Sequence, residues 1–128
     1  MELTILIILF ALLQFTFFTM RTGFTRDKYG VSAPKVVGNE TWERIYRVQQ
    51  NTMEQLVVFI PAIIIFSMHV SDKWVVIPGV AFLLGRQIYS HLYVKNPEKR
   101  ALGMVLSIFS NVALVLGSLS MLIIDLFA

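Results

Sequence analysis

Long apolar runs separated by short polar stretches dominate the pattern of this chain. Residues 3–20 are apolar except for three threonines and one glutamine, and residues 56–70 form a second, mainly apolar run. A helix needs about 20 consecutive apolar residues to cross the hydrocarbon core of a bilayer. The pattern therefore predicts an all-α integral membrane protein, a single four-helix bundle domain over residues 1–128 with helices at about 3–21, 41–70, 73–94 and 97–126.

The second predicted helix begins with a polar half. As a helix, residues 41–70 would be about 45 Å long, whereas the hydrocarbon core is about 30 Å thick. The polar half must therefore stand out of the bilayer. Arg47, Asn51 and Glu54 follow the i, i+4, i+7 spacing, so they share one helix face at the membrane boundary. A cation, an amide and a carboxylate at this depth need partners.

Short polar side chains predict helix ends and helix contacts. Asn39 or Thr41 is expected to cap the second helix, and Asp72 to cap the third, because such side chains accept hydrogen bonds from the free amides of a first turn. Gln14 and Asn111 stand inside apolar runs. Amides in such positions are expected to form hydrogen bonds between helices rather than ligand contacts.

The charged residues are few but unevenly placed. The net charge is +3, and all Lys and Arg residues except Lys73 lie in 21–47, in the second half of the third helix, or around 95–100. The positive-inside rule then places both termini in the periplasm or lumen and the polar stripe toward the cytoplasm. Because the chain has no cysteine and two histidines, no disulfide and no metal site are expected. No nucleic acid is expected as a partner.

The third predicted helix carries a second polar stripe at i, i+3 and i+7: Arg86, Tyr89 and Tyr93. Ionisable side chains within a membrane are rare, and they are usually paired or functional. One interpretation is an ion pair between Glu54 and Arg86 that joins the second and third helices. The other is a pocket for an anionic guest, because one carboxylate cannot neutralise Arg86 together with Arg47 and Arg100. The sequence leaves both interpretations open.

Two spaced motifs resemble those of a known family. They are Glu43-Arg44-x-Tyr46-Arg47-x-Gln49-x-Asn51-x-x-Glu54, followed by an apolar run with Pro61, and Gly85-Arg86-x-x-Tyr89-x-x-x-Tyr93, with Arg100 seven residues further on. Both resemble the MAPEG family, the membrane-associated proteins of eicosanoid and glutathione metabolism. The resemblance covers the second to fourth helices by motif and the first by topology only. It implies a homotrimer that binds glutathione between neighbouring subunits near the cytoplasmic face.

The resemblance also implies roles for individual residues. The positions that match glutathione contacts are Arg47, Asn51, Glu54, Tyr89 and Tyr93. Gln49 matches a contact from the adjacent subunit, and Arg26 is similar in placement to a loop arginine at the glycine end of glutathione. Arg100 matches the arginine that holds the glutathione thiolate, which makes it the candidate catalytic residue. Gln55 departs from the pattern, because the leukotriene-synthase branch has a tyrosine there.

The resemblance, together with these residues, implies a glutathione-dependent membrane transferase or peroxidase that acts on hydrophobic electrophiles or lipid hydroperoxides. The alternative is a non-enzymatic protein that binds lipid or glutathione; the family's non-enzymatic branch lacks the arginine matching Arg47 and has aspartate in place of Glu54. A small multidrug transporter is a third hypothesis, but such proteins usually carry an essential glutamate in the first helix, and 3–20 has no charge. Short loops and the lack of cysteine indicate a bacterial inner membrane.

Overall fold

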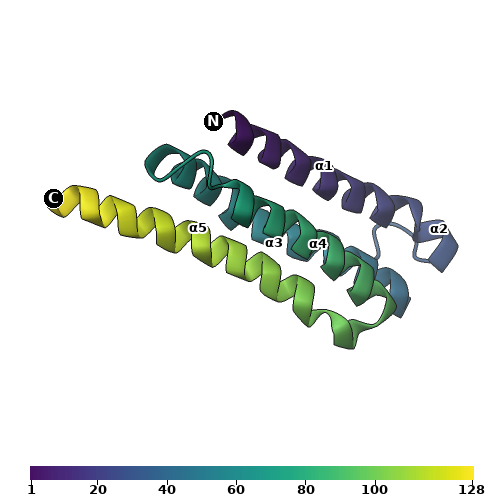
Figure 1. Ribbon diagram of the computed structural model, residues 1–128. Helices are drawn as coiled ribbons and strands as arrows, with labels where there is room; N and C mark the ends of the chain where they lie inside the picture. Colours follow the sequence, from purple (N-terminus) through teal and green to yellow (C-terminus); the bar gives the residue numbers. More distant parts are fainter.

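Four long helices make up the molecule in a computed structural model that describes residues 1–128. They are α1 (Glu2–Phe24), α3 (Glu40–His69), α4 (Val76–Lys95) and α5 (Ala101–Phe127), with a short α2 (Arg26–Tyr29) and a 3-10 turn η1 (Pro97–Lys99). The long helices run side by side in an elongated bundle with both termini at one end (Figure 1). We call this end, with the α3–α4 turn, the terminal end. The opposite end, with α2 and η1, is the basic end.

Three segments are long and apolar enough to cross a membrane. They are Glu2–Phe24, Glu40–His69 and Pro97–Phe127. The all-α membrane architecture expected from the sequence is thereby confirmed. The remaining long helix, α4, is 20 residues long, which corresponds to about 30 Å, and carries Arg86 near its middle. That α4 also crosses the bilayer stays a prediction.

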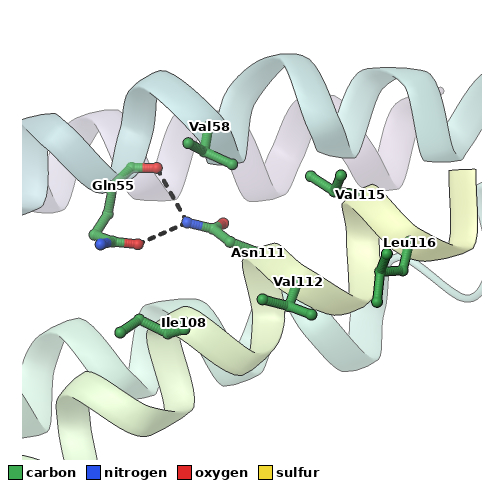
Figure 2. Close-up of a pocket in the computed structure, with 7 residues that line it drawn as sticks. All are labelled: Gln55, Val58, Ile108, Asn111, Val112, Val115 and Leu116. Atoms are coloured by element: carbon green, nitrogen blue, oxygen red, sulfur yellow. Dashed lines mark hydrogen bonds between the residues drawn. The ribbon is translucent and has the colours of Figure 1, made fainter. Parts of the chain in front are cut away.

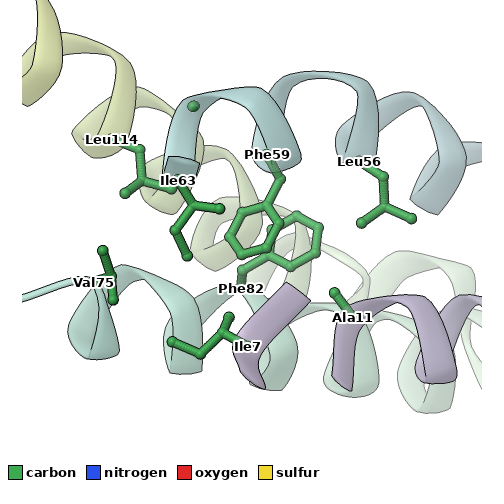
Figure 3. Packing of buried hydrophobic residues seen from close by; sticks show 9 residues of the cluster. Ile7, Ala11, Leu56, Phe59, Ile63, Val75, Phe82 and Leu114 are labelled. Atoms are coloured by element: carbon green, nitrogen blue, oxygen red, sulfur yellow. The ribbon is translucent and has the colours of Figure 1, made fainter. Parts of the chain in front are cut away.

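A layer of apolar side chains from all four long helices forms the core. Phe59 of α3 and Phe82 of α4 stack with their ring centroids 3.9 Å apart, and both are fully buried. Ile7 and Ala11 of α1 close this layer from one side and Leu114 of α5 from the other, as Figure 3 shows. Burying such side chains contributes about 1.5–3 kcal/mol each relative to exposure in water, a term that lipid reduces. The core therefore fixes the four helices relative to one another.

Two glycines let α4 and α5 approach closely near the basic end. A Cβ at Gly85 would lie 2.8 Å from the Ser107 Oγ and 3.0 Å from the main-chain oxygen of Gly103. A Cβ at Gly103 would collide with the main-chain nitrogen of Tyr89. Small residues are the usual means by which helices approach in membranes, where dispersion forces drive the packing. The contact fixes the start of α5 beside the second half of α4.

The expected side-chain cap of α3 is confirmed, but other helix ends differ from the expected ones, and α5 begins at Ala101 instead of about residue 97 because Pro97–Lys99 forms η1. Asn39 is the N-cap of α3, and its side chain accepts from the main-chain nitrogen of Trp42 at 2.9 Å. The segment after α1 contains α2, which the loop composition did not predict. Asp72 was expected to cap the third helix, and that prediction is wrong. α4 begins at Val76 without a side-chain cap, and the amides of Lys73 and Trp74 bond to the Ser71 hydroxyl instead.

Asp72 instead joins three segments at the terminal end. Its Oδ1 accepts hydrogen bonds from the Thr4 hydroxyl at 2.6 Å and the Ser67 hydroxyl at 2.8 Å. Its Oδ2 lies 3.1 Å from the Met1 amine, the one ion pair within the chain. The hydrogen bonds from these two hydroxyl groups, and to a smaller extent the amine, hold the pKa of the Asp72 carboxyl well below its ordinary value. The terminal end is thus closed by partners from its own chain.

Candidate functional site

A cavity of about 290 Å³ lies along the outer face of α3 at the basic end. The three residues of the predicted stripe, Arg47, Asn51 and Glu54, all line it. Val36 and Val37 of the α2–α3 connection form the opposite wall. Arg47 and Glu54 are exposed and form no ion pair within the chain. The cavity therefore presents a free cation and a free carboxylate to a guest.

A hydrogen bond links this stripe to the tyrosines of α4. The Asn51 Nδ2 donates to the Tyr89 hydroxyl oxygen at 2.6 Å. Tyr89 and Tyr93 stack with their ring centroids 5.1 Å apart and their planes 10° from parallel. Tyr89 is buried, whereas Tyr93 is half-buried. The two polar stripes that the sequence predicts therefore meet at Asn51 and Tyr89.

Arg86 does not pair with Glu54. Its side chain is 2% exposed, and its guanidinium carbon lies 4.3 Å from the centroid of the Tyr89 ring. Its Nε and Nη2 atoms are buried without a hydrogen-bond partner. No ion pair between Arg86 and Glu54 forms within one chain, because Arg86 is buried against the Tyr89 ring while Glu54 lies on the exposed face of α3. A buried guanidinium without a partner is destabilising, so binding of an anion or a hydrogen-bond acceptor there would be favourable.

Arg100 lies between η1 and α5 and is exposed. Its Nη1 donates to the main-chain oxygen of Pro97 at 3.3 Å. Gly103, one turn later on the same helix face, packs on the main chain of Tyr89. Because the short η1 connection makes α4 and α5 antiparallel, Arg100 lies beside the next turn of α4, at the level of Tyr93. The glycine contact thus positions the candidate catalytic arginine.

Two other predicted residues lie apart from the cavity lining. Arg26 is on α2, where its Nη1 donates to the main-chain oxygen of Lys35 at 2.7 Å. Gln49 is half-buried and lies about 200° around α3 from Arg47, since successive helical residues turn by about 100°. Gln49 therefore cannot serve the same cavity as Arg47 within one chain.

A second cavity, of about 360 Å³, opens sideways between α3 and α5. Five aliphatic side chains and two amides line it: Gln55, Val58, Ile108, Asn111, Val112, Val115 and Leu116 (Figure 2). The Asn111 Nδ2 donates to the Gln55 Oε1 at 2.7 Å and to the Gln55 main-chain oxygen at 3.3 Å. The Gln14 Nε2 similarly donates to the main-chain oxygen of Leu83 at 3.0 Å. The interhelical hydrogen bonds expected of Asn111 and Gln14 are thus confirmed.

Several residues that line the 290 Å³ cavity were not predicted from the sequence. Glu43, Tyr46 and Gln50 are among them, together with the two loop valines. Glu43, Arg47, Gln50 and Glu54 follow the i, i+4, i+7, i+11 spacing, so extending the helical stripe toward the N-terminus would have found Glu43, and including the position four residues before Glu54 would have found Gln50. No sequence signal placed the valines, because a loop wall depends on tertiary contacts.

The chemistry that the site can perform follows from its charges. Arg47 can bind a carboxylate, Glu43 and Glu54 can bind an ammonium group, and Gln50 and Asn51 can donate and accept hydrogen bonds. The structure contains no group of three or more His, Cys, Asp or Glu side chains placed to hold a metal ion. The arrangement is suited to a small molecule that carries both signs of charge.

Comparisons with known proteins agree with these features. A family model described as MAPEG family matches residues 3–120. An uncharacterized protein of Synechocystis sp. is 39% identical over 114 residues, 89% of this chain and 83% of that protein. Microsomal glutathione S-transferase 2 of Homo sapiens is 30% identical over 95 residues, 74% of this chain and 65% of the human protein. A probable microsomal glutathione S-transferase of Dictyostelium discoideum is 35% identical over 79 residues, 62% of this chain and 53% of that protein.

The matched segments of the two transferases are thus less than two-thirds of their own lengths. The match to the family model, in contrast, takes in all four long helices up to residue 120, and with them both polar stripes and Arg100. The resemblance carried by the two motifs is thereby confirmed, and this chain belongs to the MAPEG family.

Proposed function

We propose that the protein is a glutathione-dependent membrane transferase or peroxidase, which joins glutathione to hydrophobic electrophiles or reduces lipid hydroperoxides. The observation that carries the proposal is the hydrogen bond from Asn51 to Tyr89, which joins a cavity lined by Arg47 and Glu54 to the tyrosine pair. The names of the human and Dictyostelium relatives support a glutathione-related activity.

Glutathione is a small peptide with two carboxylates, one ammonium group and a thiol. In the proposed complex, Arg47 binds a carboxylate and Glu54 the ammonium group, while Asn51 and the hydroxyls of Tyr89 and Tyr93 supply neutral hydrogen bonds. These groups orient the thiol toward the start of α5. Holding the reactants in one geometry removes much of the entropic part of the barrier.

Arg100 is the proposed catalytic residue. A thiol has a pKa of about 8.5, and an adjacent guanidinium favours the thiolate, which is the nucleophile. Lowering that pKa by two units requires about 2.7 kcal/mol of preferential stabilisation of the thiolate. One charge-assisted contact in a partly desolvated site supplies energy of this order. The exposed side chain of Arg100 keeps most of its N–H donors free for this contact.

The hydrophobic second substrate is proposed to enter from the membrane through the 360 Å³ cavity between α3 and α5. Gln55 lines this cavity and follows directly on Glu54, which lines the other one. The two proposed substrate sites therefore approach each other on adjacent residues of α3. The lateral opening suits a molecule dissolved in lipid.

The proposed assembly is a homotrimer in a bacterial inner membrane, with the basic end toward the cytoplasm. A neighbouring subunit would explain Gln49, which lies on the side of α3 away from its own cavity, as a contact for the neighbour's glutathione. The positive-inside rule supports the orientation, because all Lys and Arg residues except Lys73 and the buried, mid-helix Arg86 lie at or near the basic end.

The test is glutathione-dependent turnover by the purified protein in detergent, with a chlorinated aromatic compound and a lipid hydroperoxide as separate substrates. Arg100→Ala is expected to lower kcat about 100-fold, because it removes an electrostatic contact to the reacting sulfur. Lys99→Ala, which removes a neighbouring exposed cation, is the matched control and should keep its activity.

Calorimetry with glutathione separates binding from chemistry. Turnover that is absent in the wild type despite glutathione binding would support the non-enzymatic alternative. An Arg100→Ala variant as active as the wild type would refute the catalytic role of this residue.

A further inference from the structure

We propose that Arg26 is a positioning residue that fixes the 31–38 segment as one wall of the cavity. This inference deepens the proposed function and rests on it for the identity of the ligand. The restraint on the segment itself can be measured without any ligand.

The Arg26 side chain joins the loop to the bundle. Its Nη1 donates to the main-chain oxygens of Lys35 at 2.7 Å and Val31 at 3.4 Å. Its guanidinium carbon lies 4.5 Å from the centroid of the Trp42 ring. Trp42 is fully buried, and its Nε1 donates to the main-chain oxygen of Thr22 at 3.1 Å. Arg26 thus holds the loop against a fixed point of the α1–α3 contact.

The far end of the same segment is held by Glu43. The Glu43 Oε2 accepts a hydrogen bond from the Gly38 main-chain nitrogen at 3.3 Å. Gly38 has a φ of 138°, a conformation that residues with a Cβ rarely adopt. Asn39 then caps α3. The segment is therefore restrained on both sides of its cavity-lining residues.

Val36 and Val37 lie between these two restraints. They line the cavity, yet they are 42% and 63% exposed and belong to neither apolar cluster of the bundle. Hydrophobic burial therefore contributes little to their position. The hydrogen bonds at Lys35 and Gly38 on either side of them have to supply it.

Arginine suits this role better than lysine does. A planar guanidinium can stack on an indole ring while it donates in its own plane to carbonyl oxygens. An ammonium group on a flexible stem cannot maintain both contacts in one geometry. Arg26→Lys therefore keeps the positive charge but loses the combined stacking on Trp42 and hydrogen bonding to the loop. This variant distinguishes a positioning role from simple attraction of an anion.

Hydrogen exchange of the full-length protein in detergent, without glutathione, measures the restraint directly. Arg26→Lys and Arg26→Met are both expected to speed exchange of the amides in 31–38 about tenfold, since hydrogen bonds from a charged donor are lost. Lys28→Met is the matched control: it removes an exposed cation from the same short helix without a bond to the loop, and its exchange should stay at the wild-type rate.

A spin label provides a second measurement of the same segment. Because the chain has no cysteine, Val37→Cys creates a single labelling site. The label should become more mobile when Arg26→Lys is added. Unchanged exchange and unchanged label mobility in both Arg26 variants would overturn the proposal.

Kinetics then relate the loop to the ligand. With the wall released, KM for glutathione is expected to rise about tenfold while kcat changes by less than about twofold, because the reacting groups are untouched. Faster exchange with an unchanged KM would overturn the positioning role. If the wild type shows no glutathione turnover, the proposed function fails, and exchange alone then decides whether Arg26 restrains the segment.

Discussion

The two ends of the bundle differ in whether their charged side chains have partners within the chain. At the terminal end, Asp72 accepts hydrogen bonds from two hydroxyl groups and forms the chain's one ion pair, so its charge is neutralised within the chain. Toward the basic end, Arg47 and Arg100 are exposed, and the mid-helix Arg86 of α4 has two buried nitrogen atoms without partners. The Asp72 carboxylate thus has partners within the chain and the buried Arg86 guanidinium has none, although Glu2, Lys73 and Asp125 at the terminal end are also exposed without an ion pair.

This difference indicates which end has a function beyond holding the bundle together. A self-paired cluster stabilises one arrangement of the helices and leaves no group free for a ligand. Unpaired cations beside a cavity keep their binding energy for a molecule that the chain does not contain. Substitutions at one end at a time therefore test the difference between the two ends.

The α4–α5 contact supports the basic end, and breaking it should have the largest effect. Gly103→Ala places a methyl group against the main chain of Tyr89, which cannot move as a flexible side chain would. Overpacking of this kind lowers the free energy of unfolding by about 1–3 kcal/mol. Thermal unfolding in detergent measures it.

Gly23→Ala is the matched control for that substitution. A Cβ at Gly23 has no other atom within 4 Å. Alanine also restricts the unfolded chain, so stability should stay equal or rise by up to about 1 kcal/mol. Equal losses for both glycines would show that the close approach at Gly103 is not a restraint on the helices.

The sequence predicts the basic end more fully than it predicts the terminal end. Helical spacing places Arg47, Asn51 and Glu54 on one face, and the structure joins that face to Tyr89, because period and motif act within single helices. The role of Asp72 could not be predicted, since Thr4 and Ser67 come from two other segments. The same limit applies to Val36 and Val37, whose position depends on contacts across the α2–α3 connection.

Removing the carboxylate should weaken the terminal end by less than the glycine substitution does. Asp72→Ala leaves the Thr4 and Ser67 hydroxyls without their shared acceptor. The expected drop is roughly a few degrees in Tm, measured by thermal unfolding in detergent. Asp125→Ala removes an exposed acid near the same end and should leave Tm unchanged. Glutathione binding should be unaffected by either change, since the cavity lies at the opposite end.

Lowering the pH should remove from the wild type the stabilisation that the Asp72 carboxylate provides. The pKa of Asp72 is lowered in the folded protein, so its stabilisation is fully present above the ordinary carboxyl value of 3.8. Below that pH the unfolded chain takes up a proton that the folded protein does not, and stability falls progressively. The Tm difference between the wild type and Asp72→Ala should be constant from neutral pH to about pH 5 and then shrink. A difference that grows with acid would contradict the role of the carboxylate.

Tyr89→Phe should have the smallest effect on folding and a clear effect on the cavity. It removes the oxygen that accepts from Asn51 and keeps the ring that stacks on Tyr93. Hydrogen bonds between membrane helices average about 0.6 kcal/mol, so the stability loss should be of that size. Glutathione affinity, measured by calorimetry, should fall by more than this, because freeing Asn51 loosens the cavity lining and removes a proposed ligand contact. Tyr29→Phe, on the short α2, is the control and should change neither quantity.

If Tyr89→Phe lowers stability and leaves affinity unchanged, the hydrogen bond between Asn51 and Tyr89 only holds the helices together, as Asp72 does at the other end. The contrast between the two ends would then rest on Arg47, Arg86 and Arg100 alone.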